Sequence, residues 1–198
     1  MPSPKNPHSM VRAGRRAFAG ALALALPVLA TFPASVAAQE TIREAKIGAV
    51  YAFSGPFAIY SPTIKNGIDM ALAELNAKGD LKLDVILEDD RSTKDDAINV
   101  YQKFIQRDNA LLIMGPLTGG QVFAAAPLAQ RAKVPVMLTS VATPGVTKVG
   151  DYVFRTSVES ATIIPNTVKV AKDLYKISKV AQVYTNDDQF SVGEFKAY

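Results

Sequence analysis

Short apolar runs alternate with longer stretches of helical periodicity from Lys46 onward, and this alternation limits the possible folds more than any other feature of the sequence. A strand, a helix and a second strand in succession form a βαβ unit, and such units build a parallel sheet with helices on its faces. We therefore predict an α/β fold. The predicted strands cover residues 47–53, 83–87, 110–114 and 134–138.

The stretches between these strands are predicted to be crossover helices. Apolar residues from Ile64 to Leu75 recur at three- and four-residue spacing, which gives one apolar face on a helix that ends near Gly79. The second helix starts at residues 92–95, where a capping side chain and an acid stand in the first turn. The third covers residues 120–132.

The pattern changes after Leu138. Residues 139–150 are rich in Thr, Pro, Gly and Ser, and a short extended segment follows at 152–156. We interpret this stretch as a crossing between two lobes. A helix over 161–177 and a strand over 179–184 would then begin a second βαβ series. The predicted domains are an incomplete N-terminal lobe over 40–155 and the truncated start of a second lobe over 156–198.

Residues 1–38 are typical of an export signal. They hold four basic residues and no acid, an apolar run over 17–32, and small residues at 35–38, so we expect cleavage after Ala37 or Ala38. A retained membrane anchor is the alternative, although the apolar run is short for a span. The residues Arg15-Arg16-Ala17-Phe18 also resemble a twin-arginine signal, which leaves the export route open between that system and Sec.

Charge and composition exclude several classes of function for the mature chain. Removing the signal leaves 18 of the 22 Lys and Arg against 18 Asp and Glu, so we expect no nucleic-acid binding. The chain has no Cys, and its one His, His8, lies in the signal. Thiolate zinc sites, Cys nucleophiles and Ser-His hydrolysis are therefore excluded. We predict a protein that is not an enzyme and has no catalytic residues, cofactor or metal.

Ligands of open parallel sheets bind beyond the carboxyl ends of the strands, where helix N-termini present free backbone N–H groups. The loops at that edge are predicted at 54–60, 88–91, 115–121 and 139–143. Three of them are rich in Gly and hydroxyl side chains, a composition that suits the capture of a carboxylate. The same residues are also ordinary turn formers, so composition alone leaves both interpretations open.

Asp89 and Asp90 are the most enzyme-like pair, because neighbouring carboxylates can bind a metal or transfer protons. Acids are also favoured just before a helix, and we prefer this structural interpretation. A flavodoxin-like or phospho-acceptor domain using the pair is a rival hypothesis. The export signal and the lack of a phosphate-binding Gly motif speak against it. Tyr51, Phe53 and Tyr101 could form a ligand cage, but their spacing favours the core.

An ordered set of motifs resembles the leucine/isoleucine/valine-type periplasmic binding proteins. The resemblance runs from about Lys46 to Gly193 and includes IGAVYAFSGPFAIY at 47–60, Glu88-Asp89-Asp90, Met114-Gly115-Pro116 and Phe154-Arg155-Thr156. It implies the type 1 periplasmic binding fold. It further implies a periplasmic monomer that closes by a hinge around an amino acid or related small apolar or aromatic carboxylate, and delivers it to an ABC permease in the inner membrane.

The resemblance also implies a set of ligand-binding residues. The 139–143 loop would meet the ligand carboxylate, an aromatic residue would cover the ligand, and a second aromatic would approach on closure. Gly119 departs from the family, which often has a ligand-binding Ser there, and Thr118 is the remaining hydroxyl nearby. The expected ligand-binding residues are Tyr60, Thr118, Gly119, Ser140, Val141, Ala142, Thr143 and Phe190.

Two functions are compatible with this resemblance. The first is the substrate-binding component of an importer, and the second is an extracytoplasmic ligand-sensing domain of the same fold. The family is longer than this chain, and the later second-lobe residues, including an acid that usually pairs with the ligand ammonium, have no counterpart in it. The departures at Gly119 and at Phe190, where the family usually has Tyr, leave the identity of the ligand open.

Overall fold

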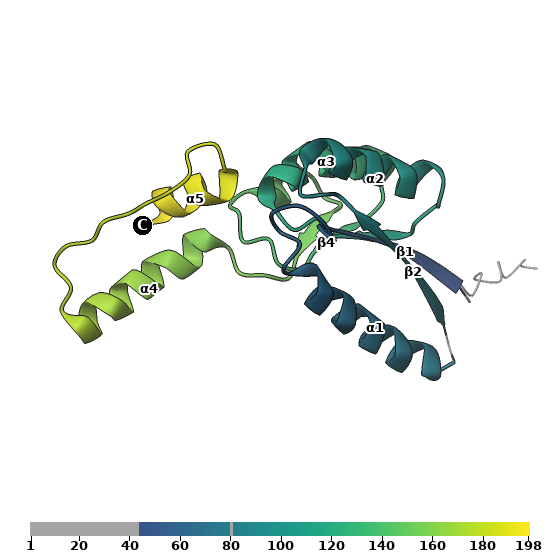
Figure 1. Cartoon of the computed structure of the whole chain (residues 1–198), viewed down its shortest axis with the longest axis horizontal. Coiled ribbons are helices and arrows are strands. Elements are labelled where there is room, and N and C mark those ends of the chain that lie inside the picture. The colour runs from purple at the N-terminus through teal and green to yellow at the C-terminus, as the bar shows by residue number, and fades with distance from the viewer. Residues whose placement is uncertain (1–43, 80) are drawn as a thin grey trace, which may run out of the picture. The chain divides into compact units, whose positions relative to one another are not determined.

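The computed structural model describes residues 44–79 and 81–198 (Figure 1). The predicted export signal at 1–38 lies outside these residues. The strands form one sheet in the order β2-β1-β3-β4-β5, and every neighbouring pair is parallel. This confirms the predicted α/β fold. The interpretation of 139–156 as a crossing between lobes is wrong for its last part, because residues 153–155 form a strand that pairs with Val136–Leu138 in this same sheet. The strands are β1 (Glu44–Tyr51), β2 (Lys82–Asp89), β3 (Leu112–Met114), β4 (Val136–Leu138) and β5 (Val153–Arg155).

Helices cover both faces of the sheet. Figure 1 shows α2 and α3 together on one face and α1 on the other. None of the helices in the described residues combines the length and the apolar character that a membrane span requires. Their bounds are α1 (Ser61–Ala77), α2 (Lys94–Gln106), α3 (Gly119–Ala132), the 3₁₀ helix η1 (Val146–Val149), α4 (Ser160–Tyr175) and α5 (Gln189–Ala197).

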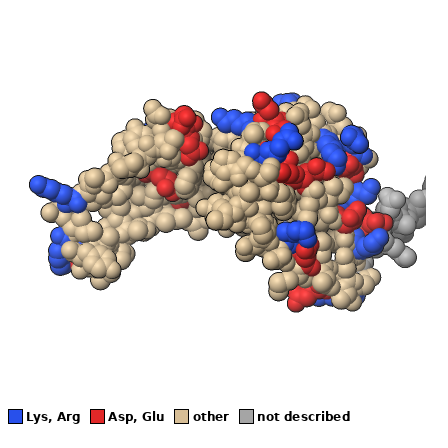
Figure 2. Space-filling model, in the orientation of Figure 1, with Lys and Arg blue, Asp and Glu red and all other residues tan. Residues whose placement is uncertain are grey.

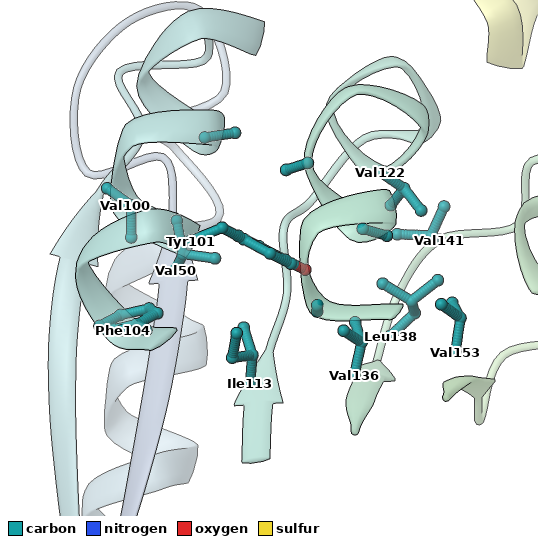
Figure 3. Close-up of a cluster of buried hydrophobic side chains, with 14 of the residues drawn as sticks. Val50, Val100, Tyr101, Phe104, Ile113, Val122, Val136, Leu138, Val141 and Val153 are labelled. Carbon is teal, nitrogen blue, oxygen red and sulfur yellow. The ribbon is translucent and has the colours of Figure 1, made fainter. Parts of the chain in front are cut away.

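The main hydrophobic core lies between the sheet and the α2–α3 layer (Figure 3). Tyr101 and Phe104 of α2 are fully buried, and they pack with Ile113 of β3 and Leu138 of β4. The Tyr101 hydroxyl donates a hydrogen bond of 2.7 Å to the carbonyl of Gly115, directly after β3. Because this bond is buried, it fixes the start of the loop that leads into α3.

A smaller core lies under α1. Ala49 and Tyr51 of β1 pack there with Ile68 of α1, and Phe53 is partly buried against them. The expectation that Tyr51, Phe53 and Tyr101 belong to the core is thereby confirmed.

The predicted strand at 179–184 is wrong. These residues form no strand, and the side chain of Val183 is fully exposed. A strand persists only where a neighbour pairs with its N–H and C=O groups. No described element pairs with this segment. The helix before it matches the prediction more closely, but it stops at Tyr175 because Lys176 adopts a left-handed conformation with φ 55°.

Charged side chains of both signs are intermixed on the face shown in Figure 2. No wide basic patch of the kind that binds the phosphate backbone appears on that face. The expectation of no nucleic-acid binding stays a prediction.

Asp89 joins two of the loops at the carboxyl edge. Its carboxylate accepts hydrogen bonds from the Phe53 N–H at 2.8 Å, from the Ser54 N–H at 3.2 Å and hydroxyl at 2.7 Å, and from the Arg91 N–H at 2.8 Å. Burial by itself raises the pKa of Asp89, but these hydrogen bonds outweigh it and hold the pKa below its ordinary value. The carboxylate therefore ties the loop after β1 to the loop after β2.

Asp90 is completely buried. Its Oδ1 accepts from the Ser92 N–H at 3.0 Å, while Oδ2 has no hydrogen-bond partner in the described residues. Burial raises the pKa of this carboxyl. No group of three or more His, Cys, Asp or Glu side chains suited to a metal is found in residues 44–79 and 81–198. The contacts of both acids are those of turn-forming residues.

Replacing Asp90 by Asn should therefore stabilise the protein, whereas replacing Asp89 by Asn should destabilise it. The pKa of Asp90 is higher in the folded state, so the wild type loses stability as pH rises from 3.8 through the folded pKa. We expect Asp90→Asn to raise the free energy of unfolding at pH 7 by more than at pH 4, as measured by urea unfolding.

Asp89→Asn is the matched control. The folded pKa of Asp89 is depressed, so its stabilising effect is present above 3.8 and is lost as pH falls through the folded pKa. This variant should be less stable than the wild type, and more so at pH 7 than at pH 3. If Asp90→Asn were less stable than the wild type at pH 7, the conclusion that burial raises the pKa of Asp90 would be wrong.

Candidate functional site

A pocket of about 290 Å³ lies at the carboxyl ends of β1, β3 and β4. It brings together every ligand-binding residue expected from the sequence, and it adds Phe57, Leu117 and Asp188, which the sequence analysis did not select. The expected residues that line it are Tyr60, Thr118, Gly119, Ser140, Val141, Ala142, Thr143 and Phe190.

The first turn of α3 forms one wall of the pocket. Thr118 is the N-cap of this helix and makes a capping box with Gln121. The Thr118 hydroxyl donates to Gln121 Oε1 at 2.9 Å, and the Thr118 N–H donates to the same oxygen at 3.2 Å. Both protons of Thr118 are therefore engaged within the protein. The N–H groups of Gly119 and Gly120 lie in the first turn, where an α-helix offers them no acceptor.

The loop over 139–143 forms a second wall, and its carbonyl groups are already bonded. Val141 O accepts from the Ser157 hydroxyl at 2.8 Å, and Ala142 O accepts from the Ser160 N–H at 2.9 Å. Thr143 O accepts from the Arg155 guanidinium at 3.0 Å. By contrast, the backbone N–H groups of residues 140–143 have no acceptor among the described residues. The loop is thus a source of free donors.

The Thr143 hydroxyl adds a further free donor. The residue is 2% exposed, and its Oγ1 has no partner in the described part of the chain. A Cβ atom placed on Gly119 would lie 2.3 Å from this Oγ1 and 2.5 Å from the Thr143 Cβ. Thr143 therefore rests directly against the first turn of α3, in space that only glycine at 119 leaves open. A buried hydroxyl without a partner costs about 1–3 kcal/mol, which a ligand acceptor would offset.

The remaining walls are largely apolar and aromatic. Phe57 and Tyr60 come from the loop after β1, and Phe190 comes from the first turn of α5. Large parts of all three side chains are exposed, as expected for a wall that a ligand could cover. The only charged residue in this lining is Asp188, whose Oδ2 accepts from the Ser191 N–H at 2.7 Å and so caps α5.

The arrangement suits a small molecule with one carboxylate and an apolar body. Residues from a helix start and a neighbouring loop that carry free N–H groups line the same pocket, together with Thr143 and its unbonded hydroxyl, and donors of this kind suit an anion. Aromatic and aliphatic side chains surround the remaining space. Pockets of this kind, apolar with a few placed donors, are typical of small-molecule sites.

The close approach of Thr143 and Gly119 can be tested by stability. We expect Gly119→Ala to lower the free energy of unfolding by about 1–3 kcal/mol, since the new methyl group overlaps the Thr143 side chain. Gly67→Ala is the matched control, because a Cβ on this glycine of α1 meets no atom within 4 Å. It should stabilise the protein by about 0.5–1 kcal/mol. Urea unfolding measures both, and a Gly119→Ala variant as stable as Gly67→Ala would refute the packing described.

Comparison with known proteins identifies relatives of this chain. A family profile described as "Periplasmic binding protein" matches residues 44–197. A Leu/Ile/Val-binding protein homolog 7 from Brucella suis is 31% identical over 114 residues, which cover 57% of this chain and 28% of the relative. A Leu/Ile/Val-binding protein homolog 6 from Brucella abortus is 29% identical over 137 residues, which cover 68% of this chain and 35% of the relative.

Solved structures agree in fold. The branched-chain amino acid transporter substrate binding protein LivJ from Streptococcus pneumoniae, in complex with isoleucine, is 26% identical with a TM-score of 0.72. The match covers 78% of this chain and 45% of LivJ. A solute binding protein of an ABC transporter from R. palustris, in complex with 4-hydroxybenzoate, is 28% identical with a TM-score of 0.70, and the match covers 78% and 42% of the two chains.

The match therefore spans less than half the length of these relatives. Within it, the parallel sheet and its helices are those of the type 1 periplasmic binding fold, as the sequence predicts. The chain belongs to the periplasmic binding protein family.

Proposed function

We propose that this chain is part of the substrate-binding component of an ABC importer, and that it binds a small carboxylate with an apolar or aromatic body. The observation that carries the proposal is the set of free donors on residues that line the pocket. They are the N–H group of Gly119, the N–H groups of 140–143 and the buried Thr143 hydroxyl. Each contact to a carboxylate is strengthened by the ligand charge.

The ligands of two relatives support this chemistry. Isoleucine and 4-hydroxybenzoate, bound by the S. pneumoniae and R. palustris proteins, share a carboxylate attached to an apolar group. In this chain, Tyr60 and Phe190 are positioned to contact such a group, while Gly119, Ser140 and Ala142 would contribute backbone at the carboxylate. Both branched-chain amino acids and aromatic acids are therefore candidates.

Hinge closure is the proposed mechanism. The 139–143 loop would bind the carboxylate, and its carbonyl groups are bonded to the segment 155–160, which spans the boundary between the two predicted lobes. Phe190 would belong to the second lobe, begun at residue 156. A ligand that contacts the loop and Phe190 together would favour the closed population, which a permease can recognise.

The proposed location is the periplasm, because the family is one of periplasmic binding proteins and residues 1–38 have the pattern of an export signal. The proposed partner is a permease in the inner membrane, and we propose a monomer. Transport is preferred to sensing because the S. pneumoniae and R. palustris relatives are described as transporter proteins.

Thermal shift and calorimetry test this proposal. The chain is titrated with L-leucine, L-isoleucine and 4-hydroxybenzoate, and with the primary amide of each. We expect at least one acid to raise the melting temperature, and its amide to have no effect, because the amide lacks the charge. If none of the acids binds, or if amides bind equally well, the proposal is wrong.

Thr143→Val tests the hydroxyl in the same assay. The substitution preserves shape and removes a buried oxygen that has no partner, so the unliganded protein should be at least as stable as the wild type. Affinity for the bound acid should fall about ten- to hundredfold, the effect of losing a hydrogen bond to a charged group. Thr118→Val is the contrasting control, because its hydroxyl caps α3 and its loss should reduce stability.

A further inference from the structure

Lys94 lies beside the predicted anion site without lining it. It is the first residue of α2, and its side chain extends along the first turn of α3. A Cβ atom placed on Gly120 would lie 3.1 Å from Lys94 Cε and 3.9 Å from Nζ. The side chain can occupy this position because Gly120 has none of its own.

This position is electrostatically unfavourable in the unliganded protein. The N-terminus of a helix carries a partial positive charge, which favours anions and disfavours cations. Lys94 is placed at the first turns of both α2 and α3; the first turn of α3 contains no acid, while that of α2 contains Asp95 and Asp96. Asp96 of α2 is bonded to Arg91 and Thr93. Lys94 itself makes no hydrogen bond or ion pair with the described residues.

A bound anion would make this charge favourable. Gly119 and Thr143 line the pocket with a first-turn N–H group and an unbonded hydroxyl, and Lys94 lies against the neighbouring Gly120, so all three would attract a negative group bound there. Lys94 does not line the pocket, so it would act on the ligand by long-range electrostatics. Its effect on affinity would depend on the charge of the ligand rather than on its shape.

We propose that Lys94 is a specificity-determining residue that selects anionic ligands by strengthening the positive potential at the N-terminus of α3. The inference rests on the proposed function, since it assumes that the carboxylate binds at this turn. Removing the Lys94 charge should weaken the binding of an acid with a net negative charge, such as 4-hydroxybenzoate, more than the binding of a zwitterion such as L-isoleucine.

Calorimetry on the full chain tests this inference with 4-hydroxybenzoate and L-isoleucine as probes. Lys94→Gln should weaken 4-hydroxybenzoate binding about threefold in low salt, the scale of an exposed charge interaction. The difference from wild type should vanish at about 1 M salt, where the Debye length is about 3 Å. Lys94→Arg should keep wild-type affinity. Gly120→Ala, which keeps the charge but displaces it, should show part of the loss.

Lys78→Gln is the matched control, since Lys78 ends α1 after its last turn and does not line the pocket. It removes the same charge and should leave affinity unchanged. The thermal stability of Lys94→Gln should equal or exceed that of the wild type, which separates its role from a structural one.

Two results would overturn the inference in distinguishable ways. If the wild type binds neither acid, the proposed function fails and the inference fails with it. If the wild type binds, but Lys94→Gln matches it at low salt or loses affinity equally at all salt concentrations, the inference alone is wrong.

Discussion

Backbone N–H groups left without acceptors at the carboxyl edge of the sheet are the feature on which the rest of the site depends. Residues 155–160 supply donors to the carbonyl groups of the 139–143 loop, so that the loop keeps its own N–H groups free. The first turn of α3 adds two more by helix geometry. A backbone that is otherwise hydrogen-bonded thus leaves unpaired donors on residues that line one pocket, and such donors favour an anionic ligand.

The hydrophobic core determines where these donors lie. Tyr101 and Phe104 anchor α2 on the sheet, and the Tyr101 hydroxyl fixes Gly115 before the turn into α3. Gln121 then bonds both the N-cap Thr118 and the carbonyl of Thr93, which starts α2. Core packing and capping together align two helix N-termini. The placement of these donors therefore follows from packing that would be needed for folding in any case.

Much of the site could be predicted because it follows from strand ends. Once the apolar runs identify parallel strands, the loops that follow them must meet at one edge, and these loops contain nearly all of the pocket lining. Phe57 was missed although it lies in a predicted loop, because nothing local distinguishes a pocket aromatic from a surface one. Leu117 also lies in a predicted loop without a distinguishing local feature, whereas Asp188 lies outside the four predicted loops.

Other features depended on contacts that no local pattern encodes. The close approach of Gly119 and Thr143 joins residues from two separate loops. The hydrogen bond from the Thr118 hydroxyl to Gln121 is evident only in the folded helix cap. The strand predicted at 179–184 had suitable residues but no described neighbour to pair with. Periodicity indicates which secondary structure a segment prefers, whereas a strand also requires a neighbouring strand that pairs with its N–H and C=O groups.

Amide chemical shifts measured by NMR during a ligand titration test the central claim most directly. If a carboxylate binds to the free donors, the N–H resonances of Gly119, Gly120 and residues 140–143 should move the furthest, and the matching primary amide should leave them in place. Shifts concentrated elsewhere, for example along α1 or in the 177–184 segment, would contradict the account.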